Sequence, residues 1–247
     1  MLLKDKTAVI TGCNRGIGKK ILEIFSENGA TVFACARSID EEFKSFLNEL
    51  IKKFNNQIIP IQFNLDDESK IKEAANNILA LNKPIDILVN NAATIHTAIF
   101  QMTSIKKLKE VFEINFFSQT IFTQYILKSM IKNKKGSIVY ISSSSALDGN
   151  EGRSAYAASK AAIITQAKTL SRELGVHNIR VNSIAPGLTD TDMMKENHKK
   201  EIVNEVLSKT SLRRIADPAE IANVVLLLSS GLTSYITGQN IRVDGGM

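Results

Sequence analysis

Short apolar runs alternate with longer amphipathic segments along the whole chain. The runs are rich in Val, Ile and Ala and have the length of strands that are buried on both faces. The segments between them repeat apolar residues at helical spacing, and this alternation predicts a parallel sheet with helices on both faces. The expected strands are 6–11, 31–36, 58–63, 85–89, 136–142, 179–185 and 240–243, and the expected helices are about 17–28, 40–54, 67–82, 104–132, 154–175 and 217–229.

One α/β domain accounts for the whole chain. No repeat, low-complexity tract or interdomain linker interrupts residues 1–247, and the 44% hydrophobic content suffices for a sizeable core. The last expected helix has the clearest start, with Asp217 as N-cap, Pro218 at the first position and Glu220 as capping-box partner. The amphipathic segment 188–212 precedes it, at the carboxyl edge of the sheet, where ligands bind. We interpret this segment as a substrate lid, with an ordinary packed surface helix as the alternative.

A glycine-rich turn joins the first expected strand to the first expected helix. Gly12, Gly16 and Gly18 stand in the order Gly-Cys-Asn-Arg-Gly-Ile-Gly. In this context glycines permit close approach of the backbone to a pyrophosphate, whose charge the helix N-terminus favours. The spacing differs from the common Gly-x-Gly-x-x-Gly fingerprint, and the glycines could serve the turn alone. With the flanking strand and helix, the turn predicts a dinucleotide site.

Two arginines indicate which dinucleotide would bind. Arg37 ends the second expected strand, where an acidic residue selects NAD(H) and an arginine accommodates the 2′-phosphate of NADP(H). Arg15 stands inside the glycine-rich turn, so two guanidinium groups could converge on one phosphate. The nearest carboxylate, Asp40, is expected to cap the next helix. The predicted cofactor is therefore NADP(H), and the alternative is that Arg37 is only a surface arginine.

A tyrosine and a lysine one helical turn apart are the candidate proton-transfer groups. Tyr156 and Lys160 share a helix face, and a fixed ammonium beside a phenol would lower the pKa of the tyrosine. Tyr156 would then be a proton donor or acceptor near neutral pH. The pair alone is also typical of a solvated helix face, but a run of four serines, 142–145, lies shortly upstream.

Charge and composition exclude several classes of function. The net charge of +6 reflects lysine-rich stretches such as 132–135 and 195–200, which suit an acidic or phosphorylated partner but are also typical of solvated helices. No basic stripe is interleaved with aromatic residues, so we expect no nucleic-acid partner. No apolar run approaches the roughly 20 residues of a membrane helix, and the first strand begins too early for a signal peptide. We therefore expect a cytoplasmic protein without a membrane partner.

Cysteine and histidine residues predict neither a redox pair nor a metal site. Cys13 and Cys35 are expected near the carboxyl ends of adjacent strands, as reduced packing residues. His96, His177 and His198 are scattered along the chain, without the spacing of metal ligands.

Six motifs together resemble the short-chain dehydrogenase/reductase family over the entire chain. They are the turn 11–18, Asn90-Asn91-Ala92-Ala93, Asn115, Ser143 placed thirteen residues before Tyr156, Lys160, and Pro186-Gly187, and their order and spacing agree with the family. Ala93 departs from the family pattern, which usually has Gly there. Within the family, the chain looks most like the 3-oxoacyl-[acyl-carrier-protein] reductases, down to the ending Ile-Thr-Gly-Gln-Asn-Ile-Arg-Val-Asp-Gly-Gly. The resemblance implies a Rossmann-type doubly wound sheet of seven parallel strands.

The resemblance also implies catalytic roles. Ser143 would hydrogen-bond the substrate oxygen, Tyr156 would protonate the forming alkoxide, and Lys160 would lower the tyrosine pKa and bind the nicotinamide ribose. Only its spacing to Tyr156 selects Ser143 from the run 142–145. Asn115 would hold a water that connects the lysine to solvent, although from the residues alone it reads as an ordinary helix position.

The cofactor-binding residues implied by the resemblance extend from the glycine-rich turn to the segment after the sixth strand. Asn64 and Leu65 would flank the adenine, and Asn91 would lie along the ribose. The full set is Gly12, Asn14, Arg15, Gly16, Ile17, Gly18, Arg37, Asn64, Leu65, Asn91, Ala92, Tyr156, Lys160, Pro186, Gly187, Thr189 and Thr191, the last four holding the nicotinamide end.

The implied reaction is NADPH-dependent reduction of a carbonyl to a hydroxyl. A 3-oxoacyl thioester of fatty acid biosynthesis is the predicted substrate, and acyl carrier protein, an acidic partner, would suit the basic surface. Lys134 matches a basic docking position of those reductases, but His177 stands where an Arg is expected. Another ketone or a sugar-derived carbonyl is the alternative substrate, whereas the intact catalytic set argues against a non-catalytic NADP(H) sensor. The resemblance further implies a homotetramer.

Overall fold

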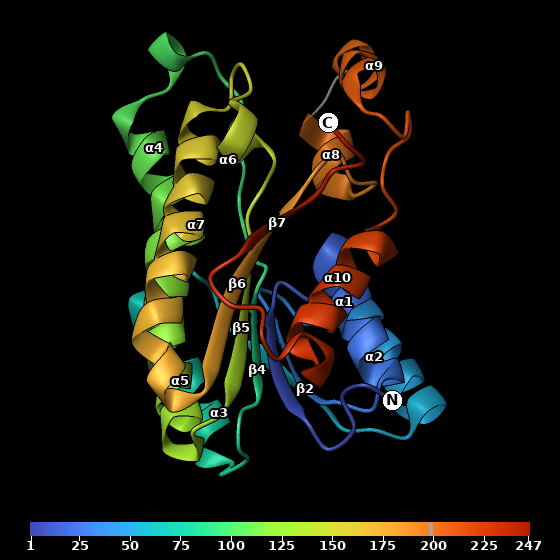
Figure 1. The fold of residues 1–247 in the computed structure, drawn as a ribbon, viewed down its shortest axis with the longest axis vertical. Helices are drawn as coiled ribbons and strands as arrows, with labels where there is room; N and C mark the ends of the chain where they lie inside the picture. Colours follow the sequence, from blue (N-terminus) through green and yellow to red (C-terminus); the bar gives the residue numbers. More distant parts are fainter. Residues whose placement is uncertain (198–199) are drawn as a thin grey trace.

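Seven strands form one parallel sheet in the computed structural model, which describes residues 1–197 and 200–247 (Figure 1). The strands are β1 (Thr7–Thr11), β2 (Thr31–Ala36), β3 (Ile58–Gln62), β4 (Ile87–Asn90), β5 (Gly136–Ile141), β6 (Ile179–Pro186) and β7 (Asn240–Val243). Their order is β3-β2-β1-β4-β5-β6-β7, with every pairing parallel. The order reverses between β1 and β4, which is where ligands bind in such sheets. The predicted doubly wound sheet is confirmed.

Helices cover both faces of the sheet. One face carries α1 (Gly16–Glu27), α2 (Glu41–Phe54) and α10 (Pro218–Ser229), and the other carries α3 (Glu68–Ala80), α4 (Ile105–Phe112), α5 (Ser118–Asn133) and α7 (Ser154–Leu174) (Figure 1). The short α6 (Ser145–Asp148) follows β5, while α8 (Asp192–Asn197) and α9 (Lys200–Lys209) lie in the segment expected to form a lid. A π-helix, η2, spans Glu113–Phe117, and 3-10 turns occur at η1 (Phe100–Met102), η3 (Gly175–His177) and η4 (Gly231–Thr233).

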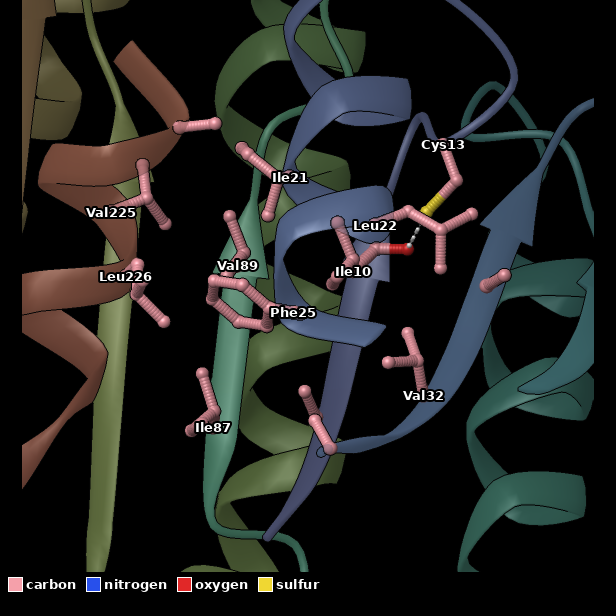
Figure 2. Packing of buried hydrophobic residues seen from close by; sticks show 14 of the residues in the cluster. Ile10, Cys13, Ile21, Leu22, Phe25, Val32, Ile87, Val89, Val225 and Leu226 are labelled. Carbon is pink, nitrogen blue, oxygen red and sulfur yellow. Dashed lines mark hydrogen bonds between the residues drawn. The ribbon is translucent and has the colours of Figure 1, made fainter. Parts of the chain in front are cut away.

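Successive residues of β1 face opposite sides of the sheet. Ile10 belongs to the buried cluster under α1 and α10, together with Phe25 and Val225 (Figure 2). Val9 belongs to the cluster on the other face, together with Phe122 of α5. This alternation is the two-residue period of a strand, and burial on both faces explains why the strands read as continuous apolar runs.

Two acidic N-caps fix helix starts as the sequence predicts. The Asp40 side chain accepts a hydrogen bond of 2.8 Å from the Phe43 backbone N–H at the start of α2. At the start of α10, Asp217 and Glu220 form the predicted capping box, with Pro218 in the first turn. Side-chain oxygens thereby satisfy backbone N–H groups that the helices leave unpaired.

The helix expected at 104–132 is interrupted. The backbone N–H of Ser118 bonds to the Glu113 carbonyl, which closes the wider turn of η2 between α4 and α5. The helical segment predicted at about 104–132 is therefore present, but the π-turn within it was not predicted. A π-turn inserts one residue into the helical ladder and so rotates the side chains after it, a device that recurs at functional sites.

The two cysteines lie on opposite faces of the sheet. The backbone N–H of Cys13 donates to the Cys35 carbonyl at 3.1 Å, so their backbones are adjacent. The Cys13 side chain nevertheless packs in the cluster under α1 and donates to the Ile10 carbonyl (Figure 2), whereas Cys35 packs in the opposite cluster. Both thiols are free and fully buried, and burial raises the pKa of each. They are packing residues, as expected.

Candidate active site

A cavity of about 430 Å³ opens at the β1–β4 switch point, beyond the carboxyl ends of the strands. Every predicted cofactor-binding residue from Gly12 to Thr191 lines it, and so does Ser143. Its walls come from the glycine-rich turn, the loop after β4, the start of α7 and the segment after β6, which are far apart in the chain. The volume is in the range of pockets that enclose a small molecule.

The glycine-rich turn is packed so tightly that it excludes side chains. A Cβ atom on Gly18 would lie 2.0 Å from the Gly12 carbonyl oxygen, and Gly12 has a φ of +72° that other residues rarely adopt. The Asn91 Nδ2 donates to the carbonyls of Thr11 and Gly12 at 2.9 and 3.1 Å, so this side chain, expected along the ribose, braces the turn. The bare backbone at the start of α1 fits the close approach of a pyrophosphate.

The two arginines expected at the 2′-phosphate both line the cavity and are exposed. The Arg15 Nη1 lies 3.6 Å from the Glu196 Oε1 on α8. Arg37 follows β2, and the nearby Asp40 carboxylate is engaged in capping α2. The end of β2 is therefore positively charged, which suits a 2′-phosphate rather than free ribose hydroxyls.

Tyr156 and Ser143 lie side by side in the cavity wall. Tyr156 lies on the first turn of α7 with 9% of its surface exposed, and Ser143 follows β5. Burial raises the pKa of Tyr156, although a hydrogen bond from Ser143 and the charge of Arg153 act in the opposite direction. The neighbouring Ser142 is not interchangeable with Ser143, because its Oγ donates to the Lys160 carbonyl at 3.0 Å.

Lys160 lies behind the tyrosine on α7. Its Nζ is 5.8 Å from the Tyr156 ring centroid and donates to the Ile141 carbonyl at 2.7 Å. Burial lowers the pKa of Lys160 to about 7. The expectation that this lysine brings the Tyr156 pKa below its usual value is therefore not met, because burial dominates and the pKa of the phenol is raised.

Asn115 lies in η2, fully buried behind the cavity wall. Its Oδ1 accepts from the Thr94 backbone N–H at 2.8 Å, and its Nδ2 donates to the Thr94 carbonyl at 2.9 Å and to Ser159 Oγ at 3.0 Å. The amide thus ties the loop after β4 to α7, at the turn that follows Tyr156. The π-turn explains how a polar residue in an apolar run reaches this position.

The segment after β6 closes the cavity from the side opposite α7. A Cβ atom on Gly187 would lie 2.7 Å from Asp244 Cα, so β6 and the end of β7 meet without room for a side chain. Five apolar residues of the expected lid also line the cavity, namely Leu188, Met193, Met194, Ile202 and Val206. His198, and with it part of the basic stretch 195–200, lies outside the described residues.

Several residues that line the cavity were not predicted from the sequence, and three of them make side-chain or backbone hydrogen bonds at the site. Arg153, at the N-cap of α7, lines the cavity three positions before Tyr156. Thr94 and Thr97, in the loop after β4, also line it. The sequence shows Arg153 only as a basic residue directly before α7. Its hydrogen-bond partners Thr97 and Asn197 lie 56 and 44 positions away in the chain, so their proximity could not be predicted from local sequence.

Residues 1–197 and 200–247 contain neither a candidate metal centre nor a candidate membrane span. No group of three or more His, Cys, Asp or Glu side chains there is placed to hold a metal ion. In the same residues, no helix is long and apolar enough to cross a membrane.

Known proteins resemble the chain over nearly its full length. A family described as enoyl-(acyl carrier protein) reductase matches residues 12–247. The 3-oxoacyl-[acyl-carrier-protein] reductase FabG of Aquifex aeolicus is 38% identical over 99% of this chain and 98% of its own. The chain belongs to the short-chain dehydrogenase/reductase family.

Solved structures of this family share the fold. A Beutenbergia cavernae protein described as an NAD(P)-dependent gluconate 5-dehydrogenase, with bound NADP, has a TM-score of 0.93 and 29% identity, over 99% of this chain and 97% of its own. A 7α-hydroxysteroid dehydrogenase complexed with NADH and 7-oxo glycochenodeoxycholic acid has a TM-score of 0.91 and 33% identity, over 99% of this chain and 94% of its own.

Proposed function

We propose that this short-chain dehydrogenase/reductase catalyses the NADPH-dependent reduction of a 3-oxoacyl thioester to the 3-hydroxyacyl thioester. The observation that carries the proposal is the arrangement of one cavity, with a bare glycine turn and two arginines at one end and the Ser143–Tyr156 pair at the other. When bound, the nicotinamide supplies the hydride. The protein residues hold the carbonyl and deliver the proton.

Proton delivery follows from the burial of the phenol. Ser143 donates a hydrogen bond to the carbonyl oxygen, and Tyr156 transfers its proton to that oxygen as negative charge develops on it. Because burial raises the pKa of Tyr156, the phenol is protonated at neutral pH, as a proton donor must be. The Lys160 ammonium, with a pKa of about 7, stabilises the phenolate that remains and can return a proton to it.

Asn115 supports the proton transfer indirectly, because it fixes the positions of the residues around the cavity. It fixes Thr94 in the loop after β4 and Ser159 on α7, so the catalytic helix stays in register with the opposite wall. The water relay that the family resemblance implies for Asn115 remains a prediction.

The lid favours an apolar chain on the substrate. Methionines 193 and 194, with Ile202 and Val206, face the cavity, and flexible methionine side chains adapt to chains of different length. FabG relatives act on acyl groups held by a carrier protein. The exposed Lys134 and the net charge of +6 suit an acidic carrier, whereas His177 in place of the expected Arg weakens that docking position.

A bulky ring ketone is the second candidate substrate. The 7α-hydroxysteroid dehydrogenase complexed with a 7-oxo bile acid is 33% identical to this chain. The same apolar lid would cover a steroid ring as readily as an acyl chain.

The oligomeric state and the cellular location stay predictions. The predicted oligomer is a homotetramer, and the predicted location is the cytoplasm. Exposed apolar side chains gather on two surfaces, which supports an assembly with two kinds of interface. One surface carries Leu227 and Leu232 around the end of α10, and the other carries Ile105 and Phe117 on the α4–α5 side.

The direct test is turnover of acetoacetyl-CoA with NADPH, followed by loss of nicotinamide absorbance. We expect turnover with NADPH well above that with NADH. The Tyr156→Phe variant should lose about 10²–10⁴-fold in kcat, because it lacks the donor proton. The matched control is Tyr235→Phe, the same change at a fully exposed tyrosine, which should keep wild-type turnover. Tight NADPH binding without turnover of the thioester would contradict the proposal and direct the assay to steroid and sugar ketones.

A further inference from the structure

Arg153 is a buried cation that the proposed proton transfer does not use. It occupies the N-cap of α7, and only 5% of its surface is exposed. Burying a guanidinium is costly unless hydrogen bonds compensate for the lost water. Its contacts therefore indicate why it is retained at this position.

The guanidinium joins three walls of the cavity. Its Nη1 donates to Thr97 Oγ1 at 2.5 Å, in the loop after β4. Its Nη2 donates to the Asn197 carbonyl at 2.9 Å, at the end of α8 in the lid. The backbone supports the same junction, because the Ala98 N–H donates to the Gly152 carbonyl at 3.0 Å.

The lid helix is in turn linked to the cavity lining. Asn197 Nδ2 donates to the Met193 carbonyl at 2.9 Å, and the Met193 side chain faces the cavity. The Arg153 contact thus leads through one short helix to the apolar surface proposed to cover the substrate. Arginine suits this role because its planar fork fixes two acceptors at once.

Arg153 also faces the reacting phenol. Its charge acts to lower the pKa of Tyr156, three residues further along α7. The other charged residues lining the cavity are Lys160 on the same helix, Glu151 before it, Asp192 on the lid, and Arg15 and Arg37 at the cofactor end.

We propose that Arg153 is a positioning residue that fastens the lid and the Thr97 loop to the start of the catalytic helix, and so holds the substrate against Tyr156. This inference rests on the proposed carbonyl reduction. It predicts that loss of the guanidinium loosens the lid and changes the electrostatic surroundings of the phenol, with the cofactor end unaffected.

The test compares Arg153→Met with Arg153→Lys, and uses Arg172→Met, an exposed arginine on the same helix, as the matched control. For acetoacetyl-CoA we expect Arg153→Met to raise KM about tenfold or more, while kcat falls less and the Kd for NADPH stays unchanged. The alkaline limb of the kcat/KM profile should move to higher pH, because the phenol loses a neighbouring positive charge. Arg153→Lys should keep the limb near its wild-type position but still raise KM, and Arg172→Met should change neither.

A second readout is independent of turnover. Limited trypsin digestion in the presence of NADPH should cut after the exposed Lys195 and Lys209 several-fold faster in Arg153→Met than in wild type. If wild type fails to reduce the thioester, the proposed substrate fails, yet the digestion still tests the lid contact. If Arg153→Met does not fold, Thr97→Val, which removes one acceptor, should raise KM and digestion without moving the alkaline limb. Unchanged KM, pH profile and digestion in a folded Arg153→Met variant would overturn the inference.

Discussion

The cavity is enclosed by two regions that are held in very different ways. One is the wall formed by η2 and α7, with Asn115 and Lys160, and the other is the lid, residues 188–212. On the wall, Asn115 is fully buried and makes three hydrogen bonds, and Lys160 is 1% exposed with its Nζ bound to a backbone carbonyl. In the lid, the ion pairs Lys195–Asp190 and Lys209–Glu205 are largely solvent-exposed. Exposed pairs contribute about 0–1 kcal/mol each. The wall is thus fixed by buried contacts, whereas exposed ion pairs and the Arg153 contact to Asn197 hold the described part of the lid.

Both ends of the lid are anchored to the rest of the fold. Thr189 and Thr210 are buried, and Thr189 pairs with Ala216 in a short parallel bridge. The backbone N–H of Leu212 donates to the Gly245 carbonyl at 3.0 Å. The described lid residues between these ends, 190–197 and 201–209, are half-buried or exposed, so their local stability is expected to be lower than that of the wall. Under the proposed function, the rigid wall would hold the reacting groups and the lid would meet the rest of the substrate.

The largest effect should come from removing the buried amide on the wall. Asn115→Leu has a similar volume but leaves the Thr94 N–H, the Thr94 carbonyl and Ser159 Oγ without their partner. We expect a loss of about 3 kcal/mol in the free energy of unfolding, measured by urea denaturation. The lid counterpart, Asn197→Leu, loses one hydrogen bond to the Met193 carbonyl and should cost less than about 1 kcal/mol. Equal losses in the two variants would contradict the contrast between wall and lid.

A smaller effect should appear in the pH dependence of the free energy of unfolding, and it comes from Lys160 in the wall. Burial lowers the pKa of Lys160 to about 7 in the folded protein, against about 10.4 in the unfolded chain. Between these values the unfolded chain binds more protons, so the free energy of unfolding rises with pH above 7 and the contribution levels off above the unfolded value. From pH 7 to 8.5 the rise due to this group should be about 2 kcal/mol at most.

The comparison with Lys160→Met isolates that contribution. Measured without cofactor, wild type should gain stability over this range, and the variant should not. The range stops at pH 8.5 because of the two cysteines. Burial keeps the thiols of Cys13 and Cys35 protonated in the folded protein, whereas in the unfolded chain they ionise at higher pH, which lowers the free energy of unfolding. Parallel pH curves for the two proteins would show that the buried amine is not titrating near 7.

Much of the fold could be predicted from local patterns. Strand β2 was expected at 31–36 and β7 at 240–243, and both have those bounds, because short apolar runs between polar segments leave few alternatives. The Asp40 and Asp217 caps were likewise predictable, since a cap depends only on residues within the next turn. The lid was placed between β6 and α10, but its division into α8 and α9 was not foreseen.

The site was less predictable where it depends on residues distant in the chain. The order and spacing of the motifs sufficed to gather the cofactor-lining residues, whose roles stay predictions. The π-turn around Asn115 has no known local code, and the partners of Arg153 are brought to it only by the folded sheet. The direction of the Tyr156 pKa was also missed, because a helix-face argument gives the distance to Lys160 but not the burial of the phenol.

The smallest effect should come from the contact between the lid and the cofactor end. Glu196 on α8 lies 3.6 Å from Arg15, and both side chains are more than half exposed. A 2′-phosphate bound at Arg15 would compete with this carboxylate. Glu196→Gln should therefore lower the Kd for NADPH by no more than about fivefold, the upper limit for an exposed pair, and less at high salt.

Paired titrations make that small change interpretable. The Kd for NADH, which has no 2′-phosphate, should stay unchanged in Glu196→Gln. Asp190→Asn is the matched lid control, because Asp190 pairs with Lys195 rather than with an arginine of the cofactor end. If Glu196→Gln tightened NADPH and NADH equally, the carboxylate would act on the lid or on the shared pyrophosphate. The lid would then be coupled to cofactor binding as a whole, and not to the feature that distinguishes NADPH from NADH.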